Sequence, residues 1–259
     1  MSMPHDTHPA IHGTAAVPRP DAHDNWILSA LAADCRDAIE SLSRPAGFRA
    51  GEAILAPGPV GTLHFIESGL ASLLYGAGCK QSVEVGTIGR NGCLGVRALF
   101  GIGHVDHSAV CILPVRTRAI AIGDVERACR SCPELRRRLF AFFQLQIRQS
   151  MQVAACNAQH SVEERLARWI LSTSDLLGET PLAVTHERVA QLLGVRRVTV
   201  TLALQNLEAR HGIRSFRRRI SIRDRARLEQ LACGCYRIGR MHGEIQRSGQ
   251  LLDSAQATT

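Results

Sequence analysis

Arginine side chains are concentrated in one short part of this 259-residue sequence. Eleven arginines lie between Thr185 and Arg227 against only three acidic residues, so this segment alone carries a formal charge of +8. The whole chain also carries +8, and the remainder is therefore neutral overall. Because a guanidinium can form two parallel hydrogen bonds with phosphate oxygens, such a compact segment predicts a polyanionic partner. Nucleic acid is favoured over a membrane surface because no amphipathic anchor accompanies the charge.

The residues around these arginines are typical of two short helices joined by a tight turn. Thr185 is a predicted helix cap, Gly194 permits a left-handed turn, and a second helix is predicted over residues 196–209. Its predicted inward residues are Val200, Ala203, Leu204 and Leu207. Its predicted outward residues are Arg196, Arg197, Val198, Thr199, Thr201, Leu202 and Gln205. This outward set can bond phosphates, bond base edges and contact a thymine methyl group.

A basic triplet, Arg217 to Arg219, lies between two short apolar segments, Ile213–Phe216 and Ile220–Ile222. The pattern predicts a β hairpin with a basic tip, which is the wing of a winged helix-turn-helix. An isolated arginine triplet is more often a solvated surface. Beside a capped helix-turn-helix, the same triplet is expected to bind phosphates.

Before this segment, the sequence predicts a helix followed by a series of short strands. Apolar residues at three- and four-residue spacing predict a helix from Trp26 to about Ser43. Brief β-branched or alternating segments bounded by Gly and Pro turns then predict an all-β sandwich or jelly roll. The predicted strands are Ala53–Leu55, Leu63–Glu67, Ala71–Tyr75, Gln81–Ile88, Ser108–Leu113 and Arg116–Ile122.

Pro133 begins a long predicted helix with apolar residues on two faces. One face would pack on the β roll and the other on a second copy in a symmetric dimer, whereas the alternative is a fully buried helix of a monomer. Ser161 and Glu164 match a capping box that starts a further helix, which Gly178 is expected to end. The residues assigned to the dimer helix are Leu139, Phe143, Ile147 and Met151.

This order of parts resembles the Crp/Fnr (catabolite activator protein) family of bacterial transcription regulators, from about Asn25 to Tyr236. The resemblance rests on Phe65 to Tyr75, Gly89 to Gly95, Glu164 to Trp169 and Thr185 to Leu207. It implies an α+β chain with a cyclic-nucleotide-binding-like β jelly roll, a long dimerisation helix and a C-terminal winged helix-turn-helix. The expected domains are a flexible tail at 1–24, a sensor roll at 25–132, a dimerisation helix at 133–157, a DNA-binding domain at 158–236 and a tail at 237–259. The segment Arg223–Cys235 looks like the extra helix that some divergent members carry after the wing.

The resemblance also implies roles for the outward residues. Arg197, Val198, Thr201 and Leu202 are expected to read bases, with Arg197 on guanine and the two aliphatic side chains near thymine methyls. The expected phosphate contacts are Thr185, Arg196, Thr199, Arg217, Arg218 and Arg219. Recognition helices about 34 Å apart in a homodimer would then read a roughly palindromic site on double-stranded DNA. A signal sensed in the β roll would change how the long helices pack across the dimer.

The expected effector pocket comprises Gly95, Val96, His107 and Ser108, and it departs from the cyclic-AMP-binding members. Val96 stands where they carry a glutamate for the ribose, and His107 stands where they carry an arginine for the cyclic phosphate. Tight binding of cyclic AMP is therefore not expected. Only Cys35 precedes Cys79, so an N-terminal iron–sulfur cluster is not expected either. No cofactor is assigned, and the effector stays unidentified.

The nine cysteines are interpreted mostly as reduced, buried residues. The pairs Cys129/Cys132 and Cys233/Cys235 keep open an alternative, a cysteine-based redox or metal sensor with the same DNA-binding output. A cupin-like metal enzyme is a weaker alternative, since His64, His104 and His107 are not closely paired on one strand with a nearby acid. We therefore predict no enzyme activity and assign no metal ligands.

The chain lacks a stretch apolar enough to cross a bilayer and lacks a signal peptide, so a cytoplasmic protein without a membrane partner is expected. Its expected partners are double-stranded DNA and a second copy of itself. RNA polymerase, if the regulator activates transcription, and a small-molecule effector are the further candidates.

Overall fold

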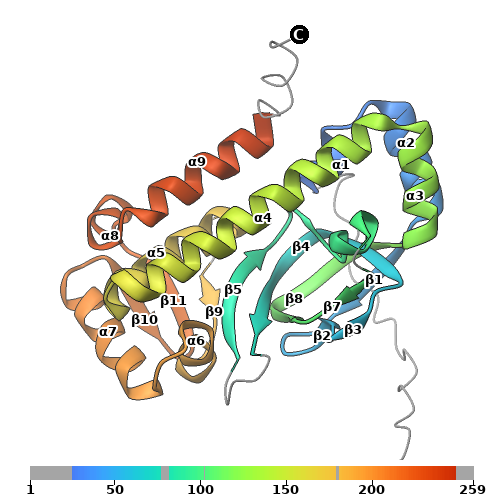
Figure 1. Ribbon diagram of the computed structural model, residues 1–259. Helices are drawn as coiled ribbons and strands as arrows, with labels where there is room; N and C mark the ends of the chain where they lie inside the picture. The colour runs from blue at the N-terminus through green and yellow to red at the C-terminus, as the bar shows by residue number, and fades with distance from the viewer. Residues whose placement is uncertain (1–24, 77–81, 102, 179–180, 249–259) are drawn as a thin grey trace, which may run out of the picture.

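The computed structural model describes residues 25–76, 82–101, 103–178 and 181–248 (Figure 1). The expected tail at 1–24 and Cys79 lie outside these residues. Figure 1 shows a β domain and a helical domain connected by one long helix, α4. Among the described residues, no helix is both long and apolar enough to cross a membrane.

The N-terminal domain is an antiparallel β roll. Its main sheet has the order β1-β8-β4-β5, with β2 paired to β8 and β6 paired to β4, while β3 and β7 form a separate pair. The strands are β1 (Arg44–Phe48), β2 (Ala53–Leu55), β3 (Gly58–Pro59), β4 (Thr62–Tyr75), β5 (Val83–Ile88), β6 (Cys93–Leu94), β7 (His104–Val105) and β8 (Ser108–Ala121). The 3-10 helix η1 (Val96–Phe100) follows β6.

Two pairs of strands predicted as separate are single long strands. β4 joins the predicted segments 63–67 and 71–75, and β8 joins 108–113 and 116–122. The β4–β8 register shifts between Ile66 and Ala71, around Gly69 at φ 85°. A Cβ at Gly69 would lie 2.0 Å from the Pro114 carbonyl oxygen, so only glycine fits this close approach. The irregularity bends the strands without ending them. The glycine between the two predicted segments therefore does not mark a turn.

The predicted helix over 26–43 is two helices, α1 (Trp26–Ser29) and α2 (Ala33–Leu42). The buried side chain of Asn25 fixes the first one. Its Oδ1 accepts from the backbone N–H groups of Ile27 and Leu28, and its Nδ2 donates to the Ile66 and Gly92 carbonyls. Asn25 therefore anchors the start of the helical segment to the roll.

Cys35 of α2 forms a disulfide with Cys132, which lies between α3 (Ile122–Ser131) and α4 (Pro133–Gln159). These two cysteines are therefore exceptions to the interpretation that most of the nine are reduced. The residues are 97 positions apart, and only the packing of α2 beside α3 brings them together. Cys129 remains a free thiol.

Helix α4 begins at Pro133 as predicted. Leu135, Leu139 and Phe142 lie in the core of the roll, and Val153 is also buried. Leu139 was expected at the dimer interface, and this assignment is wrong because the side chain is fully buried against the roll. Phe140 and Met151 are exposed, so α4 retains an apolar outer face.

The C-terminal domain contains α5 (Val162–Leu177), β9 (Leu182–Ala183), α6 (His186–Leu193), α7 (Arg197–Ala209), β10 (Ile213–Phe216), β11 (Arg219–Ile222), α8 (Arg225–Leu231) and α9 (Cys235–Ser248). The Ser161–Glu164 capping box and the left-handed Gly178 bound α5 as predicted. The predicted tail at 237–259 is wrong up to residue 248, since α9 continues to that point beside α4 (Figure 1). The segment predicted as one extra helix over 223–235 contains α8 and only the first residue of α9.

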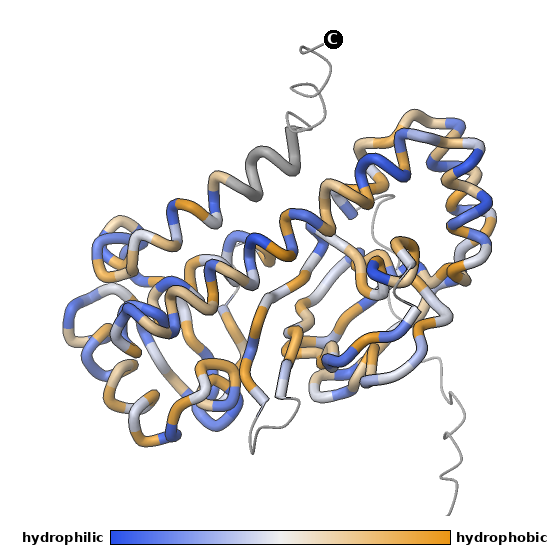
Figure 2. Tube along the Cα trace, in the orientation of Figure 1, coloured by the Kyte–Doolittle hydropathy of each residue, from blue (hydrophilic) through white to orange (hydrophobic). Residues whose placement is uncertain are grey.

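Hydrophobic residues gather in one cluster inside the roll and a second that joins the two domains. The second cluster contains Leu70, Leu74 and Ile112 of the roll together with buried residues of α5, α6 and α7. Figure 2 shows hydrophobic and hydrophilic residues alternating along the helices, as expected of amphipathic helices with one buried side. The predicted DNA-binding segment is therefore packed directly on the β roll.

Candidate nucleic-acid interface

Helices α6 and α7 form the predicted helix-turn-helix. The Thr185 hydroxyl caps α6 by accepting from the Arg188 N–H at 3.1 Å. Gly194 ends α6 at φ 64°, a left-handed conformation that glycine adopts without strain. Val200, Ala203, Leu204 and Leu207 are buried as predicted and pack α7 against α5 and α6.

The outer face of α7 carries exposed aliphatic side chains beside arginines. Val198 is 69% exposed and Leu202 57% exposed, while Arg196 and Arg197 are also exposed. Large apolar side chains that remain in solvent next to charged groups are typical of a surface that a partner covers. The first turn of α7, which presents Arg197 and Val198, is the part of a recognition helix that normally contacts base edges.

Thr201 differs from the other predicted base-reading residues. It is half-buried, and its hydroxyl donates to the Arg197 carbonyl at 3.2 Å. Its Oγ1 also lies 3.1 Å from Nδ1 of His186 at the start of α6. Sequence reasoning missed His186, because helix spacing alone does not show that its ring reaches the recognition helix.

The wing is the hairpin β10–β11, extended by β9 into a three-stranded sheet. Phe216 pairs with Arg219, so Arg217 and Arg218 form a two-residue turn, with φ values of 44° and 65°. Asn-Gly is the preferred sequence for such a turn, and a residue other than Gly, Asn or Asp costs about 1 kcal/mol or more at each left-handed position. Arginine at both positions is unfavourable for folding, which indicates that these side chains serve binding rather than the stability of the hairpin.

Among the described residues, some of the side chains predicted to contact phosphates are exposed and unpaired, whereas others are half-buried or already hydrogen-bonded. Arg196, Arg217, Arg218 and Arg219 are exposed, and within the described part of the chain none forms an ion pair with an acidic residue. Arg217 lies over the Phe216 ring, 4.9 Å from its centroid, which keeps the guanidinium near the wing tip. Thr199 is half-buried, and the Thr185 hydroxyl is already used as a cap. The free positive charge therefore lies on α7 and the wing.

The helix-turn-helix packs closely on strand β5 of the roll. A Cβ at Gly194 would lie 2.7 Å from Cγ1 of Val83, so the turn between α6 and α7 leaves no room for a side chain. The guanidinium of Arg165 in α5 also donates to the Leu193 carbonyl at the end of α6. The position of the recognition helix is thus set by contacts with both the roll and α5.

Glu84 of β5 is buried at this junction and accepts from the Ser72 hydroxyl at 2.7 Å. Burial raises the pKa of Glu84, while hydrogen bonds from Ser72 and Thr87 and the charges of Arg168 and Arg188 oppose the rise. A raised folded-state pKa means that the folded protein keeps the proton as pH rises, whereas the unfolded chain releases it. The contribution of Glu84 to the free energy of unfolding is complete below the unfolded-state pKa. It is lost as pH rises through the folded-state pKa.

Glu84→Gln should therefore reduce the fall in thermal stability between pH 5 and pH 8. Thermal unfolding of the variant and the parent protein at both pH values measures this difference. Glu126→Gln, which changes an exposed glutamate of α3, is the matched control and should leave the difference unchanged. An unaltered pH dependence in Glu84→Gln would show that this carboxyl does not contribute.

The expected effector-pocket residues lie on neighbouring elements of the roll. Gly95 and Val96 are at the start of η1, and His107 and Ser108 are at the start of β8. The Val96 side chain is buried in the core of the roll. A separate cavity of about 140 Å³ lies between α4, α5, β5 and α9, and none of the four predicted residues lines it.

Comparisons with known proteins agree with this geometry. A family model for the Crp-like helix-turn-helix domain matches residues 164–231. The global nitrogen regulator of Nostoc sp. (strain PCC 7120 / SAG 25.82 / UTEX 2576) is 26% identical over 187 residues, covering 68% of this chain and 83% of that protein. The global nitrogen regulator of Synechocystis sp. (strain ATCC 27184 / PCC 6803 / Kazusa) is 25% identical over 195 residues, covering 71% and 86%.

Solved structures share the fold. FixK2 from Bradyrhizobium japonicum superposes with a TM-score of 0.64 at 18% identity, covering 74% of this chain and 98% of that one. A Crp/Fnr-family transcriptional regulator from Thermus thermophilus gives a TM-score of 0.60 at 24% identity, covering 73% and 98%. With its β roll, its long helix and its matched domain, the chain is a transcription regulator that has a Crp-like helix-turn-helix DNA-binding domain and shares the fold of Crp/Fnr regulators.

Proposed function

We propose that the chain acts as a homodimer that reads a roughly palindromic DNA site through α7 and the wing. The observation that carries this proposal is the combination of exposed Val198 and Leu202 with free arginines on α7 and at the wing tip. Base edges would meet the start of α7, and phosphates would meet Arg196 and the wing. The expected specificity differs from that of cyclic-AMP members because Val198 and Leu202 stand where their pattern has a glutamate and a second arginine.

The outer face of α4 is the proposed dimer interface. Phe140, Ile147 and Met151 are separated by seven and four residues, and exposed Ala154 and Ala158 continue the stripe. Spacing of this kind forms the seam of a two-helix coiled coil. Phe143 lies at its edge, where it also stacks on Phe100 with ring centroids 5.5 Å apart. Two-fold symmetry about this seam would supply the two recognition helices that a palindromic site requires.

The division between base-reading and phosphate-binding arginines is testable. Arg197→Ala should cost about 1–3 kcal/mol at one base pair of the half-site and relax the preference there. Arg218→Ala should instead weaken binding to all sequences by a similar factor. Selection of bound sequences from a random DNA pool, followed by titrations on the selected site and its single-base variants, measures both effects. Equal loss of selectivity in the two variants would contradict the division.

We propose that the signal acts through the packing of the roll on the DNA-binding domain. Gly194 against Val83 and Arg165 against the Leu193 carbonyl support a rigid connection between β5, α5 and the recognition unit. A ligand that bound two arrangements of this junction unequally would shift the population that can dock on DNA. Gly95, Val96, His107 and Ser108 remain the proposed effector pocket, and RNA polymerase remains a proposed partner.

Two features of that pocket argue against cyclic AMP. Val96 cannot accept a ribose hydrogen bond, and burial lowers the pKa of His107, with the nearby charge of Arg97 acting in the same direction. Asp106 opposes this shift but does not reverse it. A neutral imidazole at pH 7 offers no fixed charge to a cyclic phosphate.

We further propose a cytoplasmic protein without enzyme activity. The cupin alternative requires clustered metal ligands within the roll. The described residues contain one group of potential metal ligands, and His64, His104 and His107 are not members of it. His64 is buried and bonded to the Thr117 hydroxyl at 3.1 Å, and burial lowers its pKa to about 4.

A further inference from the structure

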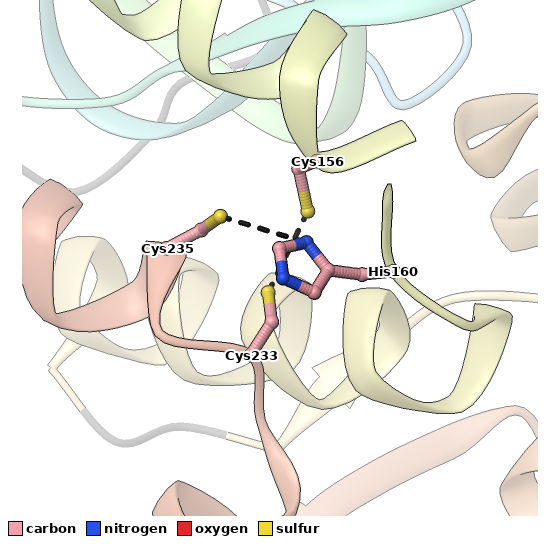
Figure 3. A group of neighbouring side chains, drawn as sticks. All are labelled: Cys156, His160, Cys233 and Cys235. Atoms are coloured by element: carbon pink, nitrogen blue, oxygen red, sulfur yellow. Dashed lines mark hydrogen bonds between the residues drawn. The ribbon is translucent and has the colours of Figure 1, made fainter. Parts of the chain in front are cut away.

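Three cysteines and one histidine converge where the long helix meets the C-terminal helices. Cys156 lies in the last turn of α4, His160 follows that helix, Cys233 lies between α8 and α9, and Cys235 begins α9. Figure 3 shows the three thiols and the imidazole pointing toward one another. One ligand atom from each of the four residues lies within 4.8 Å of those of the other three.

The distances suit a single ion rather than a larger cofactor. The Cys156 and Cys233 sulfurs are 3.5 Å apart, and the Cys235 sulfur is 3.7 Å from Nδ1 of His160. In a tetrahedral zinc site, a Zn–S bond of about 2.3 Å places two thiolate sulfurs about 3.8 Å apart. An iron–sulfur cluster would need its cysteines farther apart, because several iron and sulfide ions lie between them.

We propose that Cys156, His160, Cys233 and Cys235 bind one zinc ion. Three thiolates and one imidazole form a common ligand set of closed structural zinc sites. The three cysteines are almost completely buried, which excludes competing water ligands and favours a structural ion over a catalytic one. The pair Cys233–Cys235 alone gives too weak a signal for this site, since its partners lie about 75 residues earlier in the sequence.

The surroundings of the cluster favour a negatively charged metal complex. Zinc with three thiolates and a neutral imidazole carries a net charge of −1. Arg165 and Arg168 of α5 lie close enough for their charges to act on Cys156 and Cys233. Within the described residues, Nε of each arginine is buried without a hydrogen-bond partner. Gln152 donates to the Cys235 sulfur at 2.9 Å, as an outer-shell group that orients a metal ligand would.

The zinc ion would connect the end of α4 with the start of α9. Arg165 lies beside the sulfurs and also donates to the Leu193 carbonyl at the end of α6. Occupation of the site would therefore fix the junction that positions the helix-turn-helix. Because metal binding is measured without DNA, failure of this proposal and failure of the proposed DNA readout are distinguishable.

Elemental analysis of the purified full-length protein, after dialysis against a weak chelator, tests the proposal. One zinc ion per protomer is expected, and Cys156→Ser or Cys235→Ser should reduce it to a residual fraction. Cys129→Ser removes a free cysteine outside the cluster and is the matched control, which should retain one ion. Unchanged zinc content in both cluster variants, or iron with acid-labile sulfide in place of zinc, would overturn the proposal.

Cobalt substitution tests the same site without depending on the folding of a serine variant. The Co²⁺ form of the unaltered chain should show thiolate-to-cobalt charge transfer and the intense visible bands of a tetrahedral ion. His160→Cys should still bind one ion and increase the charge-transfer intensity, because a fourth thiolate replaces the imidazole. Weak octahedral Co²⁺ bands, or a disulfide among the three cysteines in protein purified without oxygen, would contradict a zinc site.

Discussion

Met151→Glu is expected to convert the proposed dimer into monomers and to weaken DNA binding about a hundredfold or more. Met151 is 67% exposed on the outer face of α4, so the substitution removes few contacts within the protomer. In a two-fold interface, it would place two carboxylates in an apolar seam, where desolvation and repulsion oppose association. Loss of the second DNA-binding unit removes an avidity of about 10²–10⁴.

Sedimentation velocity and DNA titration at the same protein concentration measure the two effects. Leu42→Glu is the matched control, because it also introduces a glutamate at an exposed apolar position, but on α2. The control should leave both mass and DNA affinity unchanged. A Met151→Glu protein that sediments like the parent would place the dimer interface elsewhere. Phe143→Glu is a less specific test, since Phe143 also stacks on Phe100 within the protomer.

Replacing the wing tip Arg217-Arg218 by Asn-Gly should weaken binding to all DNA sequences while stabilising the hairpin. Asn-Gly relieves the left-handed strain at both positions, which is worth about 1 kcal/mol or more at each. Four phosphate contacts per dimer would be lost, so the slope of log K against log salt should fall by about 3.6. At low salt the affinity should fall on the order of a hundredfold to a thousandfold.

DNA titration over a range of salt concentrations, combined with thermal unfolding, measures both parts of this prediction. The design separates loss of charge from damage to the wing, since the substituted turn is expected to fold better than the original. A variant with raised stability and an unchanged salt slope would show that the wing tip does not contact phosphates. Arg130→Gln, a surface arginine at the end of α3, is a control for the change in total charge.

The sequence predicts the DNA-binding segment well because each part of it depends on local rules. Thr185 as a cap, Gly194 as a left-handed turn and the Ser161–Glu164 capping box all act within four residues. The buried face of α7 also follows from helix period alone. The residues assigned to bases and phosphates remain predictions, since the structure places them on the surface without a partner.

Features that depend on distant residues could not be predicted in the same way. Leu139 has the spacing of an interface residue, but only the position of the roll shows that it is a core residue. The Cys35–Cys132 disulfide and the Cys156 cluster join residues far apart in sequence, and the spacing of neighbouring cysteines does not identify these distant partners. The helix over 235–248 is not predicted because its own sequence is weakly apolar and resembles a tail.

The hydrophobic cluster shared by the two domains limits how this regulator could be re-engineered. Cutting the chain after α4 would leave Leu70, Leu74 and Ile112 of the roll without their covering helices. A DNA-reading module transplanted to another sensor would likewise lose the β5 surface on which Gly194 rests. Chimeric regulators built from this chain would therefore need to exchange the β5 surface and the helix-turn-helix as one unit.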